Sequence, residues 1–532
     1  MDAKSTIQQG KAVLGIEFGS TRIKAVLIDG ESKPIAQGSH EWENRLENGL
    51  WTYSLEDIWG GVQACYADLA ANVRNEYGVE IETLGAIGIS AMMHGYMAFD
   101  KDGGMLAPFR TWRNTNTGAA AKELSELFNF NMPLRWSLSH LYQVILDDEP
   151  HVKDVAFITT LAGYIHWQLT GRKVIGIGDA SGIMPVDSKT RNYDAAMVTK
   201  FDELAAGKGF GRKLAEILPE VLVAGDEAGL LTAGGASRLD VSGKLKAGIP
   251  MCPPEGDAGT GMVATNSVRQ RTGNVSAGTS SFSMIVLEKE LSRPYEAIDM
   301  VTTPDGSPVA MVHCNNCTSD LNAWVGIFRE FAELMGVKCD IGEIYGKLYN
   351  NALTGDKDCG GLVSYNLFSG EPVIGLTEGS PLFVRSVNDS FSLANFMRAN
   401  LNASVAVLKI GNDILFHDEH VKVDRITGHG GLFKTPGVGQ RILSSALNAP
   451  ISVMETAGEG GAWGMALLAS YLVNNGAAKP LDEWLDSEVF AGNKGTEIMA
   501  TQEEVAGFDA YLKNYLRKLP VEQTAVELRG LY

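Results

Sequence analysis

The hydrophobic pattern near the start of the chain predicts two strands joined by a tight turn. Leu14–Glu17 is an apolar run that ends in a carboxylate, and Arg22–Asp29 carries the β-branched residues that suit a strand. Between them lies the small, polar turn Gly19-Ser20-Thr21. Such a turn presents oriented backbone N–H groups beside two hydroxyls, which suits the binding of phosphate oxygens. An ordinary surface hairpin is the alternative, and this stretch alone does not decide between the two.

The same pattern of apolar strand, glycine tip and apolar strand returns further along the chain. Asn274–Gly278 leads into a tip that begins Gly278-Thr279, and Phe282–Leu287 follows as a strand. Two such hairpins would let two domains hold one polyphosphate from opposite sides. The repetition therefore favours phosphate binding at both positions. Glu17 would repel phosphate by itself, so we expect it to face a cation, with Mg²⁺ the expected one.

Helical and strand patterns follow one another along the rest of the chain. Ser54 opens an amphipathic helix, with Asp57 three residues later as in a capping box. The other predicted elements are the strand Leu84–Ser90, the helix Gly118–Leu127, a strand and helix within Phe157–Gly171, a helix opening at Gly256-Asp257, the strand Val309–Cys314, the helix Leu321–Leu334, the strands Val421–Ile426 and Ile451–Met454, the helix Ala462–Val473 and a terminal helix within Asn493–Tyr532.

Two polar segments after predicted elements are candidates for ligand binding. The strand Leu84–Ser90 runs into Met93-His94, and ligands in open α/β sheets gather outside the carboxyl ends of strands. A lone histidine is, however, more often merely hydrogen-bonded. Thr111–Thr117 combines a tryptophan, an arginine, two asparagines and three hydroxyls. It is either a polyol-binding loop or a capped turn before the next helix, and the sequence leaves both open.

Two glycine clusters follow predicted strands in the second half of the chain. Gly428–Gly431 comes directly after Val421–Ile426, and Gly458–Gly461 lies between Ile451–Met454 and the next helix. Tandem glycines let a flat ligand such as adenine lie close to the backbone. The two clusters therefore suggest one shared nucleotide pocket.

Composition limits the classes of protein to consider. A chain of 532 residues exceeds one compact core and implies two domains of roughly 250 residues each. A formal net charge of −19 argues against a nucleic-acid or anionic-membrane surface. Met1–Lys11 has no apolar segment of a signal peptide, and the longest apolar run, Trp463–Val473, is shorter than the roughly 18 residues of a membrane span. We therefore expect a cytoplasmic protein.

Cysteines and known nucleotide motifs narrow the choice further. Six cysteines in so long a chain form no disulfide framework. Cys314 and Cys317 make a lone CxxC, for which buried structural thiols are favoured over a redox pair or half a zinc site. No Gly-Lys-Ser or Gly-Lys-Thr occurs, which excludes the P-loop class. Gly259-Thr260-Gly261 begins a GxGxxA pattern, but no clear strand precedes it, so we discount a dinucleotide fold.

From about Val13 to Val473 the chain resembles the FGGY carbohydrate kinases, within the actin-like, ribonuclease-H-like ATPase group. The segments that carry the resemblance, in the family's order, are GIEFGSTRIK (first phosphate motif), Met93-His94-Gly95 (substrate segment of xylulose kinases), Leu169-Thr170-Gly171 with Asp179-Ala180-Ser181, Gly256-Asp257 (catalytic aspartate), Gly278-Thr279-Ser280 (second phosphate motif), and Gly428–Gly431 with Gly460–Gly464 (adenosine binding).

The resemblance implies an α/β fold with two actin-like (ribonuclease-H-like) domains around a central cleft. The N-terminal FGGY domain would span residues 12–263, the C-terminal FGGY domain 264–490, and a C-terminal extension 491–532. Three departures stand out. Glu17 replaces the usual aspartate, and two charged positions of the pentulose kinases, an aspartate and an arginine, are Asn114 and Asn116 here. Tyr365–Pro372 only partly matches the Gly-Glu-Arg-Thr-Pro signature, because it lacks the arginine.

The resemblance also implies an ATP-dependent sugar kinase that uses Mg²⁺. Asp257 is the expected catalytic base, although it could instead cap the helix that follows it, or do both. The expected binding residues are Glu17 and Asp257 for the metal, Gly19, Ser20, Thr21, Lys24, Gly278, Thr279, Gly430, Gly431 and Gly460 for ATP, and Met93, His94, Trp112, Asn114 and Asn116 for the acceptor.

The acceptor and the class of protein keep named alternatives. A ketopentose such as xylulose or ribulose is the first expectation, and another polyol, an aldonate or a signalling sugar is the alternative. A non-catalytic, actin-like ATP-binding sensor is the alternative from another class, and the presence of Asp257 favours the enzyme. As partners we expect a small sugar, no nucleic acid and no membrane, with a homodimer as the candidate assembly.

Overall fold

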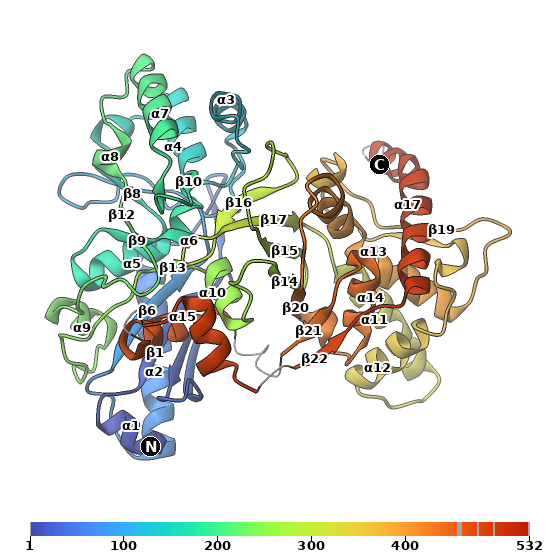
Figure 1. Cartoon of the computed structure of the whole chain (residues 1–532), viewed down its shortest axis with the longest axis horizontal. Helices are drawn as coiled ribbons and strands as arrows, with labels where there is room; N and C mark the ends of the chain where they lie inside the picture. The colour runs from blue at the N-terminus through green and yellow to red at the C-terminus, as the bar shows by residue number, and fades with distance from the viewer. Residues whose placement is uncertain (1, 455–459, 476–477, 493–494, 530–532) are drawn as a thin grey trace. The chain divides into compact units, whose positions relative to one another are not determined.

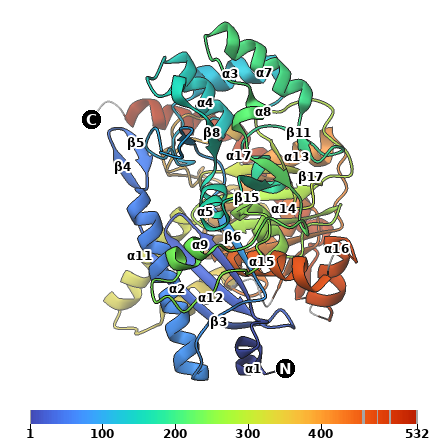
Figure 2. The same cartoon turned by 90° about the vertical axis from the view of Figure 1, so that its left-hand side faces the viewer.

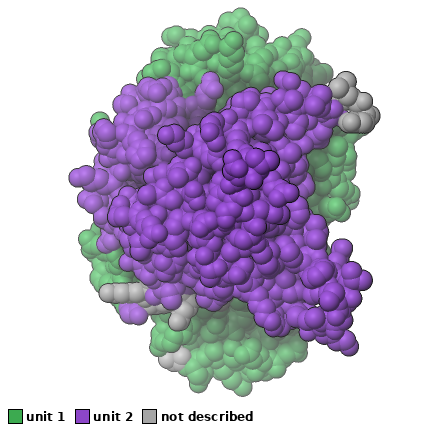
Figure 3. Space-filling view, turned by 90° about the vertical axis from the view of Figure 1, so that its right-hand side faces the viewer, with its two compact units in different colours: residues 1–268, 300–309, 459–491 green, residues 269–299, 310–458, 492–532 purple. Residues whose placement is uncertain are grey.

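The computed structural model describes residues 2–454, 460–475, 478–492 and 495–529 (Figure 1). It divides into two compact units, which Figure 3 shows in different colours. Unit 1 comprises Met1–Val268, Met300–Val309 and Glu459–Ala491, and unit 2 comprises Arg269–Asp299, Ala310–Gly458 and Gly492–Tyr532. Two segments from the second half of the sequence therefore belong to unit 1. The domain boundary predicted between residues 263 and 264 divides the sequence once, whereas the two units are each made of several segments. The predicted boundary stays a prediction.

Unit 1 is built on a five-stranded sheet in the order β13-β6-β1-β2-β3. The strands of this sheet are β1 (Val13–Phe18), β2 (Arg22–Ile28), β3 (Pro34–Glu41), β6 (Ala86–Ala91) and β13 (Glu255–Gly256). β1 runs antiparallel to β2 and parallel to β6, and β6 runs parallel to β13. The predicted first hairpin is confirmed, because β1 and β2 pair in register, with Val13 opposite Ile28 at one end and Phe18 opposite Ile23 at the other.

Strand alternation gives this sheet two different faces. Leu14, Ile16 and Phe18 of β1 lie in a buried core together with apolar residues of α2 (Leu55–Tyr77). The capping box predicted for α2 at Ser54 and Asp57 is present. α2 packs along β3, as Figure 2 shows.

The opposite face carries glycines that admit α15 (Gly460–Ser470) at close range. A Cβ atom on Gly15 of β1 would lie 2.1 Å from the backbone oxygen of Ala462. On Gly88 of β6 it would lie 2.6 Å from Cε of Met465. Residues Gly461–Ser470 of this helix are buried, as expected for a helix that is apolar on all sides.

The remaining elements of unit 1 surround this sheet or form small additions to it. They are α1 (Ala3–Gln8), β4 (Arg45–Glu47), β5 (Leu50–Thr52), β7 (Met97–Phe99), α3 (Gly118–Phe128), α4 (Ser137–Leu146), β8 (Phe157–Thr159), α5 (Leu161–Thr170), β9 (Val174–Gly176), α6 (Ile177–Ala180), β10 (Val186–Asp187), β11 (Asn192–Tyr193), α7 (Ala195–Gly207), α8 (Leu214–Ile217), β12 (Glu220–Leu222), α9 (Ala233–Leu239), α10 (Asp257–Ala264) and α16 (Leu481–Trp484).

Most of a seven-stranded sheet in the order β16-β17-β15-β14-β20-β21-β22 belongs to unit 2, and only residues 300–302 of β16 and 308–309 of β17 are grouped with unit 1. The strands of this sheet are β14 (Thr272–Ala277), β15 (Ser281–Val286), β16 (Asp299–Thr302), β17 (Pro308–Cys314), β20 (Arg425–His429), β21 (Ile451–Val453) and β22 (Thr496–Ile498). β14 and β15 form the predicted second hairpin. The other elements are α11 (Ser319–Leu334), α12 (Ile341–Ala352), β18 (Val363–Tyr365), β19 (Leu382–Val384), α13 (Leu393–Asp413), α14 (Val438–Leu447) and α17 (Gln502–Arg529).

Two local predictions were wrong in unit 2 and at its border. The strand predicted at Val421–Ile426 is β20, which runs from Arg425 to His429, so Gly428 lies inside the strand and not after it. β20 starts late because its pairing with β14 begins only at Arg425, and Asp424 just before it forms an ion pair with Arg271. The N-cap of α10 is Gly256, with Asp257 as the first helical residue, so Asp257 does not serve as the cap.

The CxxC segment begins at the last residue of β17 and contains buried thiols, as predicted. Cys314 and Cys317 are free cysteines with at most 1% of their surface exposed. Burial raises the pKa of the Cys317 thiol to about 12. Among the residues that the structure describes, no group of three or more His, Cys, Asp or Glu side chains is arranged to hold a metal ion.

Candidate active site

Three parallel strands of unit 1 end side by side and place acidic residues in one row. Glu17 near the end of β1 is in register with Ser90 of β6, which in turn is in register with Glu255 of β13. Asp257 follows β13 immediately and begins α10. Because ligands of open α/β sheets bind outside the carboxyl ends of strands, this edge is the expected place for a site.

The backbone around Asp257 fixes the direction of its carboxylate. The backbone N–H of Met93 donates to Asp257 Oδ1 at 3.2 Å. The hydroxyls of Ser90 and Thr260 lie 3.2 Å apart and join the end of β6 to α10. A side-chain Cβ on Gly256 would lie 2.1 Å from Cγ of Met93. Small residues beside Asp257 are therefore required for the segment after β6 to approach it.

Glu17 is held from the other side by the start of α15. The backbone N–H of Ala462 donates to Glu17 Oε2 at 3.2 Å. A Cβ on Gly461 would lie 2.3 Å from Glu17 Oε1. Lys24 is directly opposite Glu17 in the β1–β2 pair. The carboxylate thus has one backbone donor and one cation beside it.

Burial raises the pKa values of both carboxylates, and the charge of Asp257 adds to the shift of Glu17. Burial, and then the charge of Asp257, raise the pKa of Glu17 to about 7, against the lowering effects of Lys24 and the Ala462 N–H. Burial raises the pKa of Asp257 to about 6, although backbone N–H donors oppose the shift. Two carboxylates that resist ionising together are a suitable setting for a divalent cation, which would relieve their repulsion.

The residues present fit an open magnesium site. Mg²⁺ usually keeps several waters and binds through one or two carboxylates together with substrate phosphates. Glu17 and Asp257 supply two such carboxylates at the strand ends, and the described residues provide no closed cage of ligands. Kinases of the family implied by the sequence use ATP and a divalent metal, and this donor set agrees with that use.

Sequence reasoning missed two further carboxyl groups beside Asp257. Asp179, in α6, accepts a hydrogen bond from the Thr160 hydroxyl at 2.5 Å. Glu255 accepts from the backbone N–H groups of Gly178 and Asp179 at 3.2 and 3.0 Å. Both are buried, with 1 and 2% of their surfaces exposed. Burial is the main cause that raises the pKa of Asp179 to about 7 and that of Glu255 to about 8.

The sequence held only a weak signal for this pair. Asp179 lay in a segment similar to the family pattern, and Glu255 stood two residues before Asp257, but neither received a role. Their positions in the structure place both residues around Asp257. Glu255 ties the start of α6 to the end of β13, and the charge of Asp257 raises the pKa of Asp179. Both therefore belong to the surroundings of the predicted base.

Met93 and His94 lie at the same end of the sheet. His94 has a left-handed backbone with φ of 69°, and Gly95 follows with φ of 86°. The His94 ring stacks on Trp136 at 6.1 Å, and its Nδ1 lies 3.3 Å from the backbone oxygen of Gly182. A strained backbone at a strand end is typical of a functional turn. The acceptor-binding role of both residues stays a prediction.

The loop Thr111–Thr117 is a different case. The Asn114 side chain accepts from the backbone N–H of Trp51 and donates to the backbone oxygens of Trp51 and Thr111. Asn114 is 4% exposed, so its amide braces this loop against β5, which supports the structural alternative for this residue. Asn116 is exposed, and Trp112 Nε1 donates to Ser20 Oγ at 3.2 Å.

The nucleotide residues predicted from glycine patterns fall into both units. Gly19, Ser20, Thr21, Lys24 and Gly460 belong to unit 1, and Gly278, Thr279, Gly430 and Gly431 belong to unit 2. Gly430 has φ of 100°, and a Cβ there would lie 2.6 Å from the backbone oxygen of Ala277. It therefore has to be glycine to follow β20 so close to the end of β14. Gly458 and Glu459 of the second glycine cluster lie outside the described residues.

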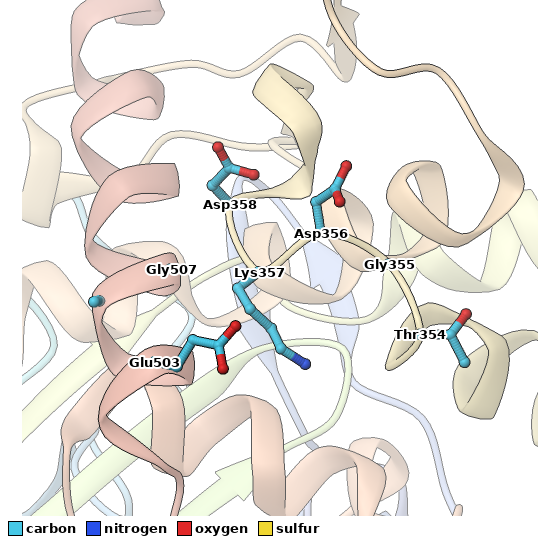
Figure 4. Close-up of a pocket in the computed structure, with 8 residues that line it drawn as sticks. Thr354, Gly355, Asp356, Lys357, Asp358, Glu503 and Gly507 are labelled. Carbon is cyan, nitrogen blue, oxygen red and sulfur yellow. The ribbon is translucent and has the colours of Figure 1, made fainter.

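Unit 2 also contains an open cavity of about 580 Å³. It is lined by the loop Thr354–Asp358 and by Glu503, Ala506 and Gly507 of α17 (Figure 4). None of the predicted site residues lines this cavity. Its lining includes the acidic and basic side chains Asp356, Lys357, Asp358 and Glu503, which Figure 4 shows as sticks.

Comparison with known proteins identifies the class. The N-terminal domain model of the FGGY family of carbohydrate kinases matches residues 12–263, and the C-terminal domain model matches residues 273–473. The chain belongs to the FGGY family of carbohydrate kinases, whose members are ATP-dependent sugar phosphotransferases. The family resemblance stated from the sequence is thereby confirmed.

Individual relatives are distant. A xylulose kinase of Haemophilus influenzae is 22% identical over 484 residues, which are 88% of this chain and 92% of that protein. A glycerol kinase of Thermococcus kodakarensis is 22% identical over 205 residues, which are 36% of this chain and 40% of that protein, so the match spans less than half of it. A solved xylulose kinase structure from Rhodospirillum rubrum has a TM-score of 0.76 at 18% identity and covers 98% of this chain and 99% of that one.

The structural likeness confirms the predicted α/β fold of two actin-like domains. Identities near 20% support a common fold but do not identify the acceptor. Among the described residues, no helix combines the length and the hydrophobicity that crossing a membrane requires.

Proposed function

We propose that this protein transfers the γ-phosphoryl group of ATP to a hydroxyl of a small polyhydroxylated acceptor, with a ketopentose such as xylulose or ribulose as the first candidate. The single observation that supports the proposal most is the position of Asp257. It begins a helix directly after a parallel strand, next to Glu17, and a backbone N–H donor fixes its carboxylate.

The proposed chemistry assigns Asp257 the role of general base. Sugar hydroxyls are weak nucleophiles, so the enzyme has to take up the hydroxyl proton as the bond to phosphorus forms. A pKa of Asp257 raised to about 6 brings this carboxylate near the neutral range in which a general base works best. Asp257 would then be mostly ionised at neutral pH and still basic enough to accept the proton.

The remaining groups would hold the phosphates and their charge. Mg²⁺, when bound by Glu17 and Asp257, supplies positive charge that offsets the charge on the transferred phosphoryl group. The backbone N–H groups at the tips of the two hairpins are proposed to bind phosphate oxygens. Lys24 would add positive charge beside Glu17. Met93 and His94 are proposed to contact the acceptor.

The acceptor could also be another polyol, an aldonate or a signalling sugar. Two neutral asparagines at positions 114 and 116 support a broader range, because the pentulose kinases carry opposite charges there. The Asn114 amide is already hydrogen-bonded to backbone groups, so it is not available to select one acceptor, which also supports a broader range. One matched relative acts on xylulose by name and another on glycerol.

A kinase assay on a panel of acceptors tests the proposal. Purified protein with Mg·ATP is offered ketoses, polyols and sugar acids, ADP release is followed, and each product is identified by mass spectrometry as a phosphate ester. We expect ADP release that depends on one or more acceptors. Tight ATP binding without phosphorylation of any acceptor would instead support the non-catalytic sensor.

A further inference from the structure

The turns of the two hairpins share a feature that neither family nor sequence pattern explains. In each turn, backbone carbonyl oxygens accept hydrogen bonds from donors outside the hairpin. A carbonyl oxygen carries partial negative charge and repels phosphate, whereas a backbone N–H attracts it. A turn can bind phosphate well only if its carbonyl oxygens are kept away from the ligand and its N–H groups are left available.

In unit 1 the donors are aromatic side chains. Trp42 Nε1 donates to the backbone oxygen of Gly19 at 2.7 Å, and Tyr53 Oη donates to the backbone oxygen of Ser20 at 2.6 Å. The Trp42 backbone N–H donates to the oxygen of Thr21 at 3.2 Å. The Trp42 and Tyr53 rings stack with their centroids 4.0 Å apart, which fixes both donors together. Burial raises the pKa of Tyr53 to about 12, so its hydroxyl remains a donor at neutral pH.

The Ser20 hydroxyl is oriented in the same way. Trp112 Nε1 lies 3.2 Å from Ser20 Oγ. An indole N–H can only donate, so the Ser20 oxygen accepts this bond and its own O–H remains to be donated. Within the described residues, no hydrogen bond from the backbone N–H of Ser20 or Thr21 is formed. The N–H groups and the Ser20 hydroxyl of this turn are thus available to donate, whereas its carbonyl oxygens are already hydrogen-bonded.

In unit 2 the same arrangement is built from different groups. The backbone N–H and the hydroxyl of Thr318 both donate to the oxygen of Gly278, at 3.0 and 2.8 Å. The backbone N–H of Cys317 donates to the oxygen of Thr279 at 2.9 Å. The described part of the chain offers no acceptor to the N–H groups of Thr279 and Ser280.

We propose that Trp42 and Tyr53 in unit 1 and Thr318 in unit 2 are positioning residues for ATP, which hold the carbonyl oxygens of the phosphate turns away from the bound phosphates. Trp112, predicted from the sequence to contact the sugar, takes part by orienting Ser20. This inference rests on the proposed function, because it assumes that the hairpins bind the phosphates of ATP.

Conservative variants separate this role from general stability. Tyr53→Phe removes one hydroxyl and keeps the stacked ring, and Trp42→Phe keeps a ring but removes the N–H. Tyr77→Phe is the matched control, since the Tyr77 hydroxyl donates to a backbone oxygen at 2.7 Å in the same sheet, at Ile35 of β3. In unit 2, Thr318→Val is paired with Thr354→Val, whose hydroxyl donates to the backbone oxygen of Asn351 at 2.7 Å.

Calorimetry with Mg·ATP and Mg·ADP measures the expected effect. Loss of one such hydrogen bond should weaken nucleotide binding about 3- to 10-fold in Tyr53→Phe and Trp42→Phe. Thr318→Val should have a smaller effect, about twofold, because the Thr318 backbone N–H still donates to Gly278. The KM for ATP should rise in parallel, while the KM for the acceptor and the melting temperature stay at the values of the wild type and both controls.

Each outcome has one meaning. Unchanged nucleotide affinity in folded Tyr53→Phe and Thr318→Val, or an equal change in the controls, would overturn the inference and leave the kinase proposal intact. A fall in melting temperature with equal rises in both KM values would show a merely structural role and would overturn it as well. If the wild-type protein bound no nucleotide, the proposed function itself would fail, and the inference would fail with it.

Discussion

Asp257 shows how the backbone alone can place a reactive carboxylate. Its position follows from the end of β13 and the start of α10, and Met93 contributes only its N–H to the orientation. We expect that such a carboxylate can be replaced by an amide of the same shape without loss of the fold. It is therefore the best position at which to separate phosphoryl transfer from ATP binding.

Replacing Asp257 with Asn or Ala should abolish most turnover and leave ATP bound. Loss of a general base commonly lowers the rate about 10²- to 10⁴-fold. Steady-state kinetics gives the rate, and calorimetry with ATP gives the affinity. Asp102→Asn, on an exposed loop where Asp102 pairs only with Lys101, is the control. Near-normal turnover in either variant would remove Asp257 from the mechanism.

Glu371 is a buried acid that hydrogen-bonds to the segment after β17. It receives hydrogen bonds from the backbone N–H and the side-chain amide of Asn316, at 2.8 and 2.7 Å, while its Oε2 has no partner within the described structure. Burial raises its pKa from 4.5 to about 7. The folded state therefore keeps a proton that the unfolded state releases near pH 4.5, and stability is lost as the pH rises from about 4.5 to about 7.

Glu371→Gln should remove this loss, because glutamine copies the protonated acid and cannot ionise. We expect the variant to gain about 1–3 kcal/mol over the wild type at pH 8 and little at pH 4.5. Urea unfolding of both proteins at several pH values measures the difference. Parallel pH profiles of the two proteins would show that Glu371 does not ionise differently in the folded state.

At the scale of elements, the second hairpin offers a clean test of phosphate binding. A Cβ on Gly278 would meet no atom within 4 Å, and the backbone there does not require glycine. The protein should therefore tolerate Gly278→Val as a fold, while the new side chain blocks the approach of phosphate to the turn. We expect at least about a tenfold loss of ATP affinity, since close backbone approach is what glycine permits.

Gly211→Val is the matched control for this variant. Gly211 is an exposed glycine in a loop of unit 1 and, like Gly278, has open space at its Cβ position. Both variants should melt at the temperature of the wild type, and only Gly278→Val should lose nucleotide binding in calorimetry. Equal ATP affinity in the two variants would remove the hairpin from the nucleotide site.

The elements also show what local sequence could and could not predict. Both hairpins followed from apolar runs on either side of a glycine tip, and the start of α2 followed from a capping box, because these signals are local. The hydrogen-bond partners of the turns are not local in sequence. Trp42 follows β3 and Tyr53 follows β5, yet they donate to Gly19 and Ser20 of the first turn. Asp179 was missed for the same reason, since it is distant in sequence and reaches the surroundings of Asp257 through the contact of α6 with Glu255. Glu255 is only two residues from Asp257, and the sequence did not show its contacts with α6.

The shifted start of β20 has a related cause. The apolar pattern of residues 421–426 fits a strand, but β14 pairs with β20 only from Arg425 onward. The start of β20 was therefore decided by its pairing with β14, which is distant in sequence. Family resemblance, which carries information about distant contacts, was what identified the fold and the aspartate at position 257.

For the whole molecule, the acceptor range is the main open property. Asn114 is used to brace its own loop and Asn116 is exposed and neutral, so an acceptor pocket there would lack a charged pair and should discriminate among hydroxyl configurations differently from one that has it. We expect D-xylulose to be one of several acceptors, with another ketopentose or a polyol equal or better.

The acceptor panel gives the measurement as a set of kcat/KM values. D-xylulose ahead of every other acceptor by about a hundredfold, or about 2.7 kcal/mol, would contradict this expectation. The same saturating ATP concentration for every acceptor makes the comparison independent of ATP affinity.

The origin of α15 has a consequence for how the protein is made. The helix fills the face of the unit 1 sheet beside β1 and β6, yet it is encoded roughly 200 residues after α10. At a translation rate of about 5–20 residues per second, about 10–40 s separate the emergence of α10 and α15 from the ribosome. Throughout that interval the N-terminal half of the nascent chain lacks the helix that covers this face, and Glu17 lacks its Ala462 donor. Unit 1 is therefore completed late, after most of unit 2 has been synthesised, and the nascent chain is a natural client for chaperones in the meantime.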